Sequence, residues 1–156
     1  MRGKELWNFM FAALLGVSMV TSSAAEQGPA DTIKSLYAQA YGIGGNSGKS
    51  GIDEKLAPRF LDGALVKLYN QALKDGRLDA DFFVQGQDFA ITKPIEIDKV
   101  EIHGEKAKVS ATLTQSFGSN PSDVKHFVFL LVKTKSGWRI DEAFCGGDSL
   151  TNWWKR

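Results

Sequence analysis

Oxygen-bearing side chains are concentrated in one short stretch, which contains Asp79, Asp81, Gln87 and Asp88 interleaved with aromatic residues. Clustered carboxylates can bind a divalent cation, and a carboxylate enclosed in a pocket can act as a general acid or base. The spacing does not match the EF-hand calcium loop, because apolar residues stand at the fifth and sixth positions. A structural interpretation competes: Asp79 caps a short turn, while Gln87 and Asp88 hydrogen-bond the backbone. We favour the structural interpretation and expect neither a metal ion nor a cofactor.

Two charged residues near the end of the chain are also candidates. By the two-residue period of a strand, Arg139 and Asp141 lie on one side, opposite Trp138 and Ile140. Arg139 with Asp88 would make a buried ion pair or an anion-binding site, and we favour the ion pair. The candidate ligand pocket therefore consists of six residues: Asp79, Asp81, Gln87, Asp88, Arg139 and Asp141.

Nucleophilic catalysis has one candidate pair, Cys145 and His126. Catalysis would require the two side chains to meet in space, with a third group to orient the histidine. The sequence identifies no such third group, and a lone cysteine is usually a small buried hydrophobe. We therefore expect no catalytic residue here.

A glycine-rich segment, residues 42–51, contains Gly48-Lys49-Ser50, which resembles the end of a phosphate-binding P-loop. That motif requires a glycine five positions before Gly48, where this chain has Ile43, and it requires a strand before it rather than a helix. We interpret the segment as a connecting loop.

The fold is predicted to centre on residues 124–145. The apolar run 127–132 is typical of a strand buried on both faces. Gly137 allows the chain to reverse, so Trp138 should begin an antiparallel partner strand.

The remaining elements complete an α+β pattern. Apolar residues recur every three or four positions in 31–41 and 58–75, which predicts two helices. Apolar and polar residues alternate in 95–102 and 106–117, which predicts two strands. Helices followed by a meander of strands favour N-terminal helices packed on one face of a curved antiparallel β-sheet. This is the arrangement of the cystatin-like or nuclear-transport-factor-like cone.

The N-terminus has the features of a secretory signal peptide. Arg2 and Lys4 precede an apolar region, and small residues follow it up to Ala25. The apolar region is shorter than the roughly 20 residues of a spanning helix, so we expect no stable membrane anchor. We predict cleavage after Ala25 and a single periplasmic domain over residues 26–156.

The bulk composition limits the possible partners. Removing residues 1–25 takes away two basic residues and one acidic residue, so a formal charge of +1 becomes neutral. A neutral chain is not steered toward nucleic acid or an anionic membrane, and neither is expected as a partner. Cys145 is the only cysteine, so no internal disulfide stabilises the domain.

The chain resembles a known group of proteins. Residues 78–88 resemble the D-x-D-P-F … Q-D stretch of the bacterial exported domain-of-unknown-function family 3828 (DUF3828), with Phe82 in place of the proline. Residues 138–141, Trp-Arg-Ile-Asp, resemble the closing W-x-I-D strand of that family, and 103–109 resemble a hairpin used by cone-fold domains. The resemblance covers residues 30–154. It implies an exported cone-like domain with no established catalytic residues to carry over.

Two functions from different classes follow. The favoured one is a non-enzymatic binding or protein-interaction module of the cell envelope, one form of which is an immunity protein for a secreted toxin. The alternative is a hydrolase or isomerase that uses Asp79, Asp81 or Asp88. A pocket holding a carboxylate with a raised pKa would favour the enzyme. An exposed aromatic patch with Trp153 or Trp154 would favour a partner surface. The sequence leaves the oligomeric state open.

Overall fold

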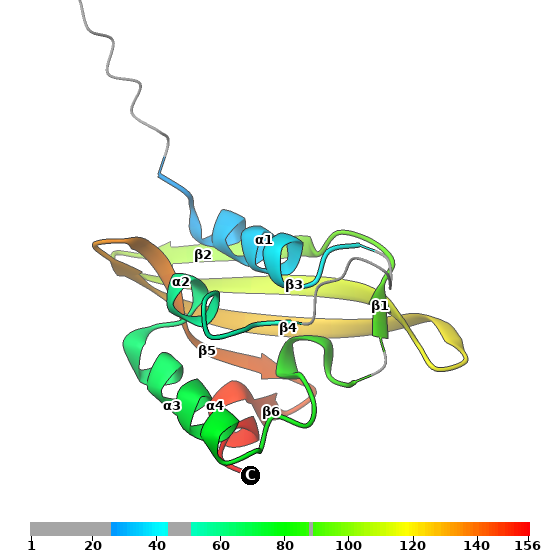
Figure 1. The fold of residues 1–156 in the computed structure, drawn as a ribbon. Coiled ribbons are helices and arrows are strands. Elements are labelled where there is room, and N and C mark those ends of the chain that lie inside the picture. Colours follow the sequence, from blue (N-terminus) through cyan, green and yellow to red (C-terminus); the bar gives the residue numbers. More distant parts are fainter. Residues whose placement is uncertain (1–25, 44–50, 88) are drawn as a thin grey trace, which may run out of the picture.

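The computed structural model describes residues 26–43, 51–87 and 89–156, and within them a single antiparallel sheet is covered by helices on one face (Figure 1). Residues 1–25, where a signal peptide is predicted, residues 44–50, which include the Gly48-Lys49-Ser50 sequence, and Asp88 lie outside the described residues. The helices are α1 (Pro29–Ala40), α2 (Ala57–Phe60), α3 (Gly63–Lys74), the 3-10 helix η1 (Phe82–Val84) and α4 (Leu150–Trp153). The strands are β1 (Phe89–Ile91), β2 (Glu96–His103), β3 (Lys106–Phe117), β4 (Asn120–Thr134), β5 (Gly137–Cys145) and β6 (Asp148–Ser149).

Strand β3 organises the sheet. One edge of β3 pairs with β4, and the other edge pairs with β2 along its first part and with β1 at its end. Beyond β4 the order continues through β5 to β6. The predicted central hairpin is confirmed as β4 and β5, and Gly137 at its turn has a φ of +99°, which favours glycine.

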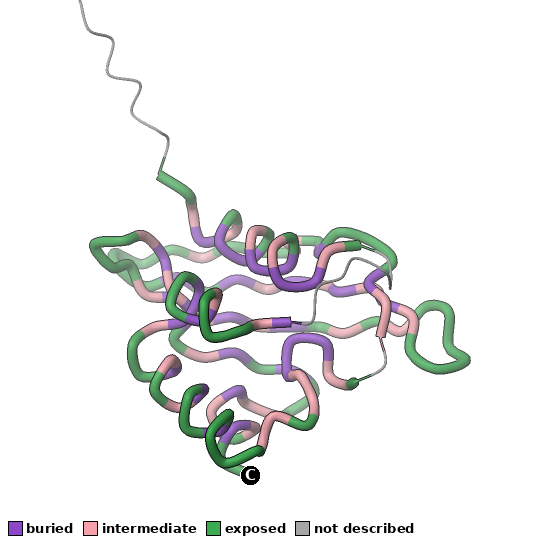
Figure 2. Tube along the Cα trace, in the orientation of Figure 1, coloured by how far each residue is buried: buried purple, intermediate pink, exposed green. Residues whose placement is uncertain are grey.

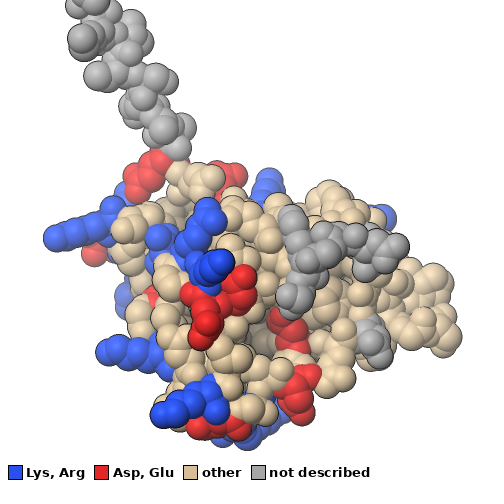
Figure 3. Space-filling view, in the orientation of Figure 1, with Lys and Arg blue, Asp and Glu red and all other residues tan. Residues whose placement is uncertain are grey.

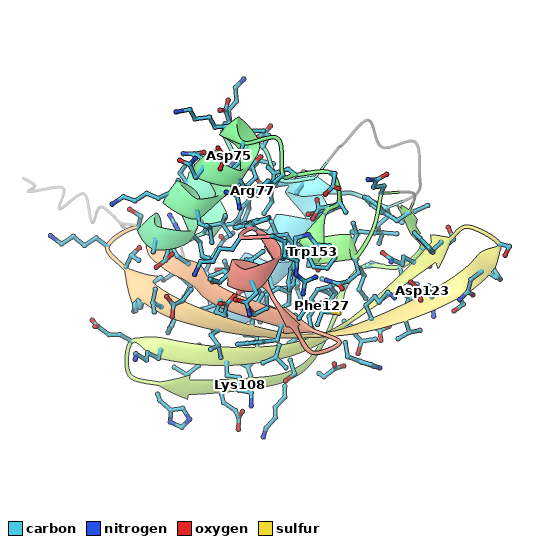
Figure 4. The ribbon with its side chains drawn as sticks, turned by 90° about the horizontal axis from the view of Figure 1, so that it is seen from below. Asp75, Arg77, Lys108, Asp123, Phe127 and Trp153 are labelled. Atoms are coloured by element: carbon cyan, nitrogen blue, oxygen red, sulfur yellow. The ribbon has the colours of Figure 1, made fainter. Side chains whose placement is uncertain are left out.

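The core lies between the helices and the facing side of the sheet, where buried residues meet in Figure 2. The predicted alternation in β3 is confirmed, since its apolar residues from Ala107 to Leu113 are buried. From β4, Phe127 and Phe129 point to the same side and stack on each other with ring centroids 5.6 Å apart. Figure 4 shows Phe127 on the side of the helices and Lys108 on the opposite side of the sheet. The predicted α+β class, helices on one face of a curved antiparallel sheet, is confirmed.

The long helix predicted over residues 58–75 is wrong in one respect, because it is broken into α2 and α3. Leu61 is extended (φ −99°, ψ 151°) and forms a parallel bridge with Ile140 of β5. The Asp62 backbone N–H donates to the Ile140 carbonyl at 2.8 Å, and the Asp62 carboxylate accepts from the Leu65 N–H at 2.8 Å as the N-cap of α3. Pairing with β5 and the cap together outweigh the local helical pattern.

The prediction that the run 127–132 is buried on both faces is also wrong. Phe127, Phe129 and Leu131 are buried, whereas Val128, Leu130 and Val132 on the other face are only half-buried. No helix of the described residues covers that face, which lies away from the helices in Figure 4.

Among the described helices, none is long and apolar enough to cross a membrane.

Candidate functional site

A cavity of about 320 Å³ opens where α3, the segment around η1 and the C-terminal helix meet. Its polar wall contains Asp79, Asp81 and Gln87, three of the six residues predicted for the pocket. Figure 3 shows a hollow on the helix-bearing side of the molecule, bordered by acidic side chains. The remaining lining is mostly apolar or aromatic: Ile52, Tyr69, Leu73, Leu78, Ala80, Phe83, Gly86, Phe89 and Trp154.

Asp81 is the most strongly held side chain of this wall. Its Oδ1 accepts the Phe83 N–H at 2.9 Å, which makes Asp81 the N-cap of η1. Its Oδ2 accepts the Tyr41 hydroxyl at 2.8 Å. Burial raises the pKa of Asp81 to about 6, and the hydrogen bonds from Tyr41 and Phe83 partly oppose that rise. Asp81 is therefore a carboxyl group in a fixed position that changes charge near pH 6.

Gly51 closes the space behind this carboxylate. A Cβ at this position would lie 2.3 Å from the Asp81 Oδ2, and the φ of Gly51 is +101°. Both constraints require glycine. The following residue is also held, because the Tyr69 hydroxyl donates to the Ile52 carbonyl at 3.0 Å. The chain around Gly51 is thus part of the site rather than only a connector.

The turn that carries Asp81 is stabilised by one neighbouring side chain and by two from distant elements. The Gln85 amide donates to the Phe82 carbonyl, the Tyr37 hydroxyl to the Phe83 carbonyl, and the Gln115 amide to the Val84 carbonyl, each at 2.8 Å. Each carbonyl of η1 therefore has a side-chain donor. These contacts tie the position of Asp81 to α1 and β3.

Aromatic rings form the apolar side of the cavity. Trp154 is buried and contacts Tyr69 and Phe83 at centroid distances of 5.4 and 6.5 Å. Trp153 is half-buried, and its indole N–H donates to the Ala80 carbonyl at 3.2 Å. Trp154 is therefore part of the wall of the cavity, and Trp153 packs beside it next to Ala80. Neither tryptophan is exposed, so they do not form the aromatic patch expected of a partner surface.

The predicted roles of Asp79 and Gln87 need one correction. Asp81, and not Asp79, caps the short turn, because the chain turns into η1 two residues later than expected. Asp79 is exposed, and its carbonyl accepts a hydrogen bond from the Gln87 amide. The prediction that Gln87 bonds the backbone is therefore confirmed. Asp88 lies outside the described residues.

Arg139 and Asp141 are not part of this cavity. Phe89 pairs with Phe117 at one end of β3, whereas Arg139 pairs with Val132, which lies opposite Lys106 at the other end. A strand rises about 3.3 Å per residue, so these ends lie far apart. The six-residue pocket is therefore wrong as a single site, because strand register separates its members.

The surroundings of the two residues are different from those predicted. The Arg139 guanidinium donates to the Trp138 carbonyl at 2.9 Å, and burial together with the nearby Arg59 lowers its pKa. Burial and the neighbouring Asp62 carboxylate raise the pKa of Asp141. The ion pair expected between Arg139 and Asp88 stays a prediction, because Asp88 lies outside the described residues.

Cys145 and His126 lie on opposite faces of the sheet. Cys145 pairs with Phe127 and is buried with it, and burial raises the pKa of the Cys145 thiol. His126 points to the other face, where its Nδ1 lies 3.1 Å from the Thr112 hydroxyl. The two groups cannot act as a nucleophile and its base. Among the described residues, no group of three or more His, Cys, Asp and Glu side chains is placed to bind a metal ion.

Sequence reasoning missed Tyr41, Gly51, Tyr69 and Trp154 as members of the site. The sequence pattern places Tyr41 only in an apolar helix stripe, and it places Gly51 only in a loop. A tyrosine on such a stripe carries a hydroxyl that needs a partner once buried, and this was the available signal.

Comparisons with known proteins give limited similarity. No family model matches the chain, and no curated protein matches its sequence. The intermembrane space region of the chloroplast protein ARC6 is 22% identical, with a TM-score of 0.44, over 74% of this chain and 91% of that one. The type VI effector–immunity complex Tae3–Tai3 from Ralstonia pickettii includes a chain that is 21% identical, with a TM-score of 0.49, over 74% of this chain and 93% of that one. Neither similarity supports an argument about function.

Proposed function

We propose that the chain is an exported, non-enzymatic binding module of the cell envelope, and that the Asp81 pocket receives a cationic group, either a small amine or a basic side chain of a protein partner. The observation that supports this function is the carboxylate of Asp81, held at two oxygens in the wall of an aromatic-lined cavity. A fixed acceptor in such a cavity is suited to recognition, because it loses little freedom when a ligand binds.

The chemistry of the lining favours a cation. An ionised carboxylate offers about four lone-pair sites, and the two hydrogen bonds to Asp81 leave the others for a ligand. Asp79 adds a second negative charge to the same wall. Aromatic rings attract cations through their negatively charged faces. The volume of about 320 Å³ is at the small end of ligand pockets, which suits a single side chain.

The cellular setting of this proposal comes from the sequence. The signal segment 1–25 supports export to the periplasm, and N-terminal sequencing of the envelope fraction should find a chain that begins near Glu26. An intact Met1 on a cytoplasmic protein would contradict export. An immunity protein that presents the pocket to a basic segment of a toxin is one form of the proposed module.

The experiment titrates the chain 26–156 with three matched probes at pH 7.5. Binding is measured by NMR chemical-shift changes or by calorimetry. The probes are N-acetyl-lysine amide, N-acetyl-arginine amide and the neutral N-acetyl-norleucine amide. We expect a basic probe to bind at least tenfold more tightly than the neutral one, and Asp81→Asn to abolish that preference. Glu54→Gln, which removes an exposed carboxylate of a neighbouring segment, is the control. Equal binding of the three probes, or an unchanged preference in Asp81→Asn, would contradict the proposal.

A second candidate function is acid–base catalysis by Asp81. The raised pKa favours it, because a carboxyl group that titrates near pH 6 can exchange protons close to neutrality. Hydrolysis of p-nitrophenyl acetate and butyrate tests this candidate. Turnover that follows a group near pH 6 and is lost in Asp81→Asn would support catalysis. Equal turnover by the wild-type chain and this variant would exclude Asp81 as the catalytic group.

A further inference from the structure

The face of the sheet opposite the helices carries an apolar stripe that the pocket does not explain. Its members are exposed or half-buried and point away from the helices. We call them the outer stripe, which consists of Val124, Val128, Leu130, Val132 and Phe144. Four of the five are in β4 and one is in β5. Val124 of β4 and Phe144 of β5 are 46% and 38% exposed, so apolar surface is available on two neighbouring strands.

The neighbouring strand shows that the stripe is a local exception. An antiparallel sheet with one solvated face usually places polar residues on it. Strand β3 follows this rule, because its outward residues from Lys106 to Thr114 are lysine, serine and threonine. Between Val124 and Val132, the outward residues of β4 break the rule at four positions, and His126 is the polar exception. Contiguous exposed apolar residues with a polar rim are typical of interaction surfaces.

Strand register places opposite charges on the two flanks of the outer stripe. Lys108 lies opposite Leu130 on the β3 side, and Glu142 lies opposite Leu130 on the β5 side. Leu130 pairs with Glu142 and Leu131 pairs with Ile140, so Asp141 is an extra residue of β5 at a β-bulge. Asp141 is exposed and lies beside Glu142. One flank is therefore basic, with Lys106 as its second member, and the other carries two carboxylates.

The flanking charges have only weak partners within the chain: Lys106 lies close enough to Asp141 to favour its charged form, and the Asp62 carboxylate opposes that effect. Neither lysine belongs to an ion pair among the described residues, and Glu101, the β2 neighbour of Lys108, is paired with Lys99 at 2.8 Å. Arg139 is the one basic residue on the acidic flank, and its guanidinium is directed to the Trp138 carbonyl. Asp141 and Glu142 carry two negative charges against the one positive charge of Arg139, so this flank is negative overall.

We propose that two copies of this chain pack face to face through the outer stripe, about a twofold axis parallel to β4. Such a rotation exchanges the two flanks and preserves position along the strand. The Lys108 flank of one copy then faces the Asp141 flank of the other, while the stripes bury each other. Sheets packed face to face lie about 10 Å apart, which brings long flanking side chains within reach.

The choice of axis follows from the charges. A twofold axis in the same plane but perpendicular to β4 would place each lysine flank over the other lysine flank. Like charges facing each other disfavour that arrangement. A homodimer with C2 symmetry needs a self-complementary surface, and the outer stripe with its two flanks is self-complementary only for the parallel axis.

Sedimentation equilibrium of the chain 26–156 between about 5 and 500 µM tests this proposal, with circular dichroism to confirm folding. We expect a reversible dimer, and we expect Leu130→Asp to be a folded monomer. Lys108→Glu and Asp141→Lys should each weaken the dimer at least tenfold. Glu142 is left unchanged because it accepts hydrogen bonds from the Ala143 and Thr151 N–H groups. Lys67→Glu, on the exposed side of α3, is the control and should dimerise normally.

The charge reversals give a sharper criterion than loss alone. A mixture of Lys108→Glu and Asp141→Lys should form a heterodimer, because both flanks then meet opposite charges, and the double variant should recover self-association. A monomer at every concentration would overturn the proposal and leave the face to a different partner. A dimer that persists in Leu130→Asp, or single reversals that the mixture does not rescue, would overturn it as well.

Discussion

Replacing Asp81 with asparagine should change the pH dependence of stability by an amount that follows from the structure. The folded-state pKa of Asp81 is about 6, against 3.8 for an unperturbed carboxyl, because burial disfavours its charged form. Each pH unit of difference corresponds to about 1.4 kcal/mol, so ionised Asp81 costs the folded state about 3 kcal/mol at neutral pH. That is a large part of the roughly 5–15 kcal/mol of a typical domain, so the effect is measurable.

The sign follows from proton binding. Between pH 4 and pH 6 the folded chain holds the Asp81 proton more tightly than the unfolded chain does. The contribution of Asp81 to the free energy of unfolding is therefore largest below pH 4. It decreases as the pH rises to about 6 and is constant at higher pH. The asparagine variant lacks this decline, although its side-chain carbonyl can still accept from Phe83 and its amide can still contact Tyr41. Relative to wild type, Asp81→Asn should gain about 2 kcal/mol between pH 4.5 and pH 7.5.

Urea unfolding followed by tryptophan fluorescence, at intervals of half a pH unit, measures this difference. Asp79→Asn removes an exposed carboxylate from the same wall and controls for a general change in net charge. A difference between Asp81→Asn and wild type that stays constant from pH 4.5 to pH 7.5 would refute the raised pKa.

Three further substitutions test the packing that positions the site. Phe129→Ala should lower the free energy of unfolding in urea by about 3–5 kcal/mol, because the Phe129 side chain is fully buried and stacks on Phe83 and Phe127. A loss below about 1 kcal/mol would contradict the assignment of Phe129 to the core. Gly51→Ala should lower stability by about 1–3 kcal/mol or more, since its φ is positive and its Cβ would meet Asp81; an unchanged melting temperature would show that this segment moves freely. Gln115→Met should cost about 1–3 kcal/mol because the buried Val84 carbonyl loses its donor, and a neutral result would show that solvent reaches η1.

The sequence determined those parts of the fold that depend on local periodicity. The alternation in β3, the turn at Gly137 and the apolar run in β4 each depend on neighbours two to four residues away, and all are present. The α+β class follows from the order of these elements. Asp81 and Gln87 were also found from composition, because oxygen-rich residues in an irregular segment rarely lie in a core.

The tertiary structure decided what local patterns do not encode. The helical pattern continues through Leu61, but pairing with Ile140 interrupts it. Arg139 and Asp81 belong to different regions because strand register places Arg139 at the far end of the sheet from Phe89. The pKa of Asp81 depends on Tyr41, which lies forty residues earlier in the chain, and on burial that exists only in the folded state. Burial and charge–charge distances are set by packing between elements, which is why the chemistry of the site became visible only in three dimensions.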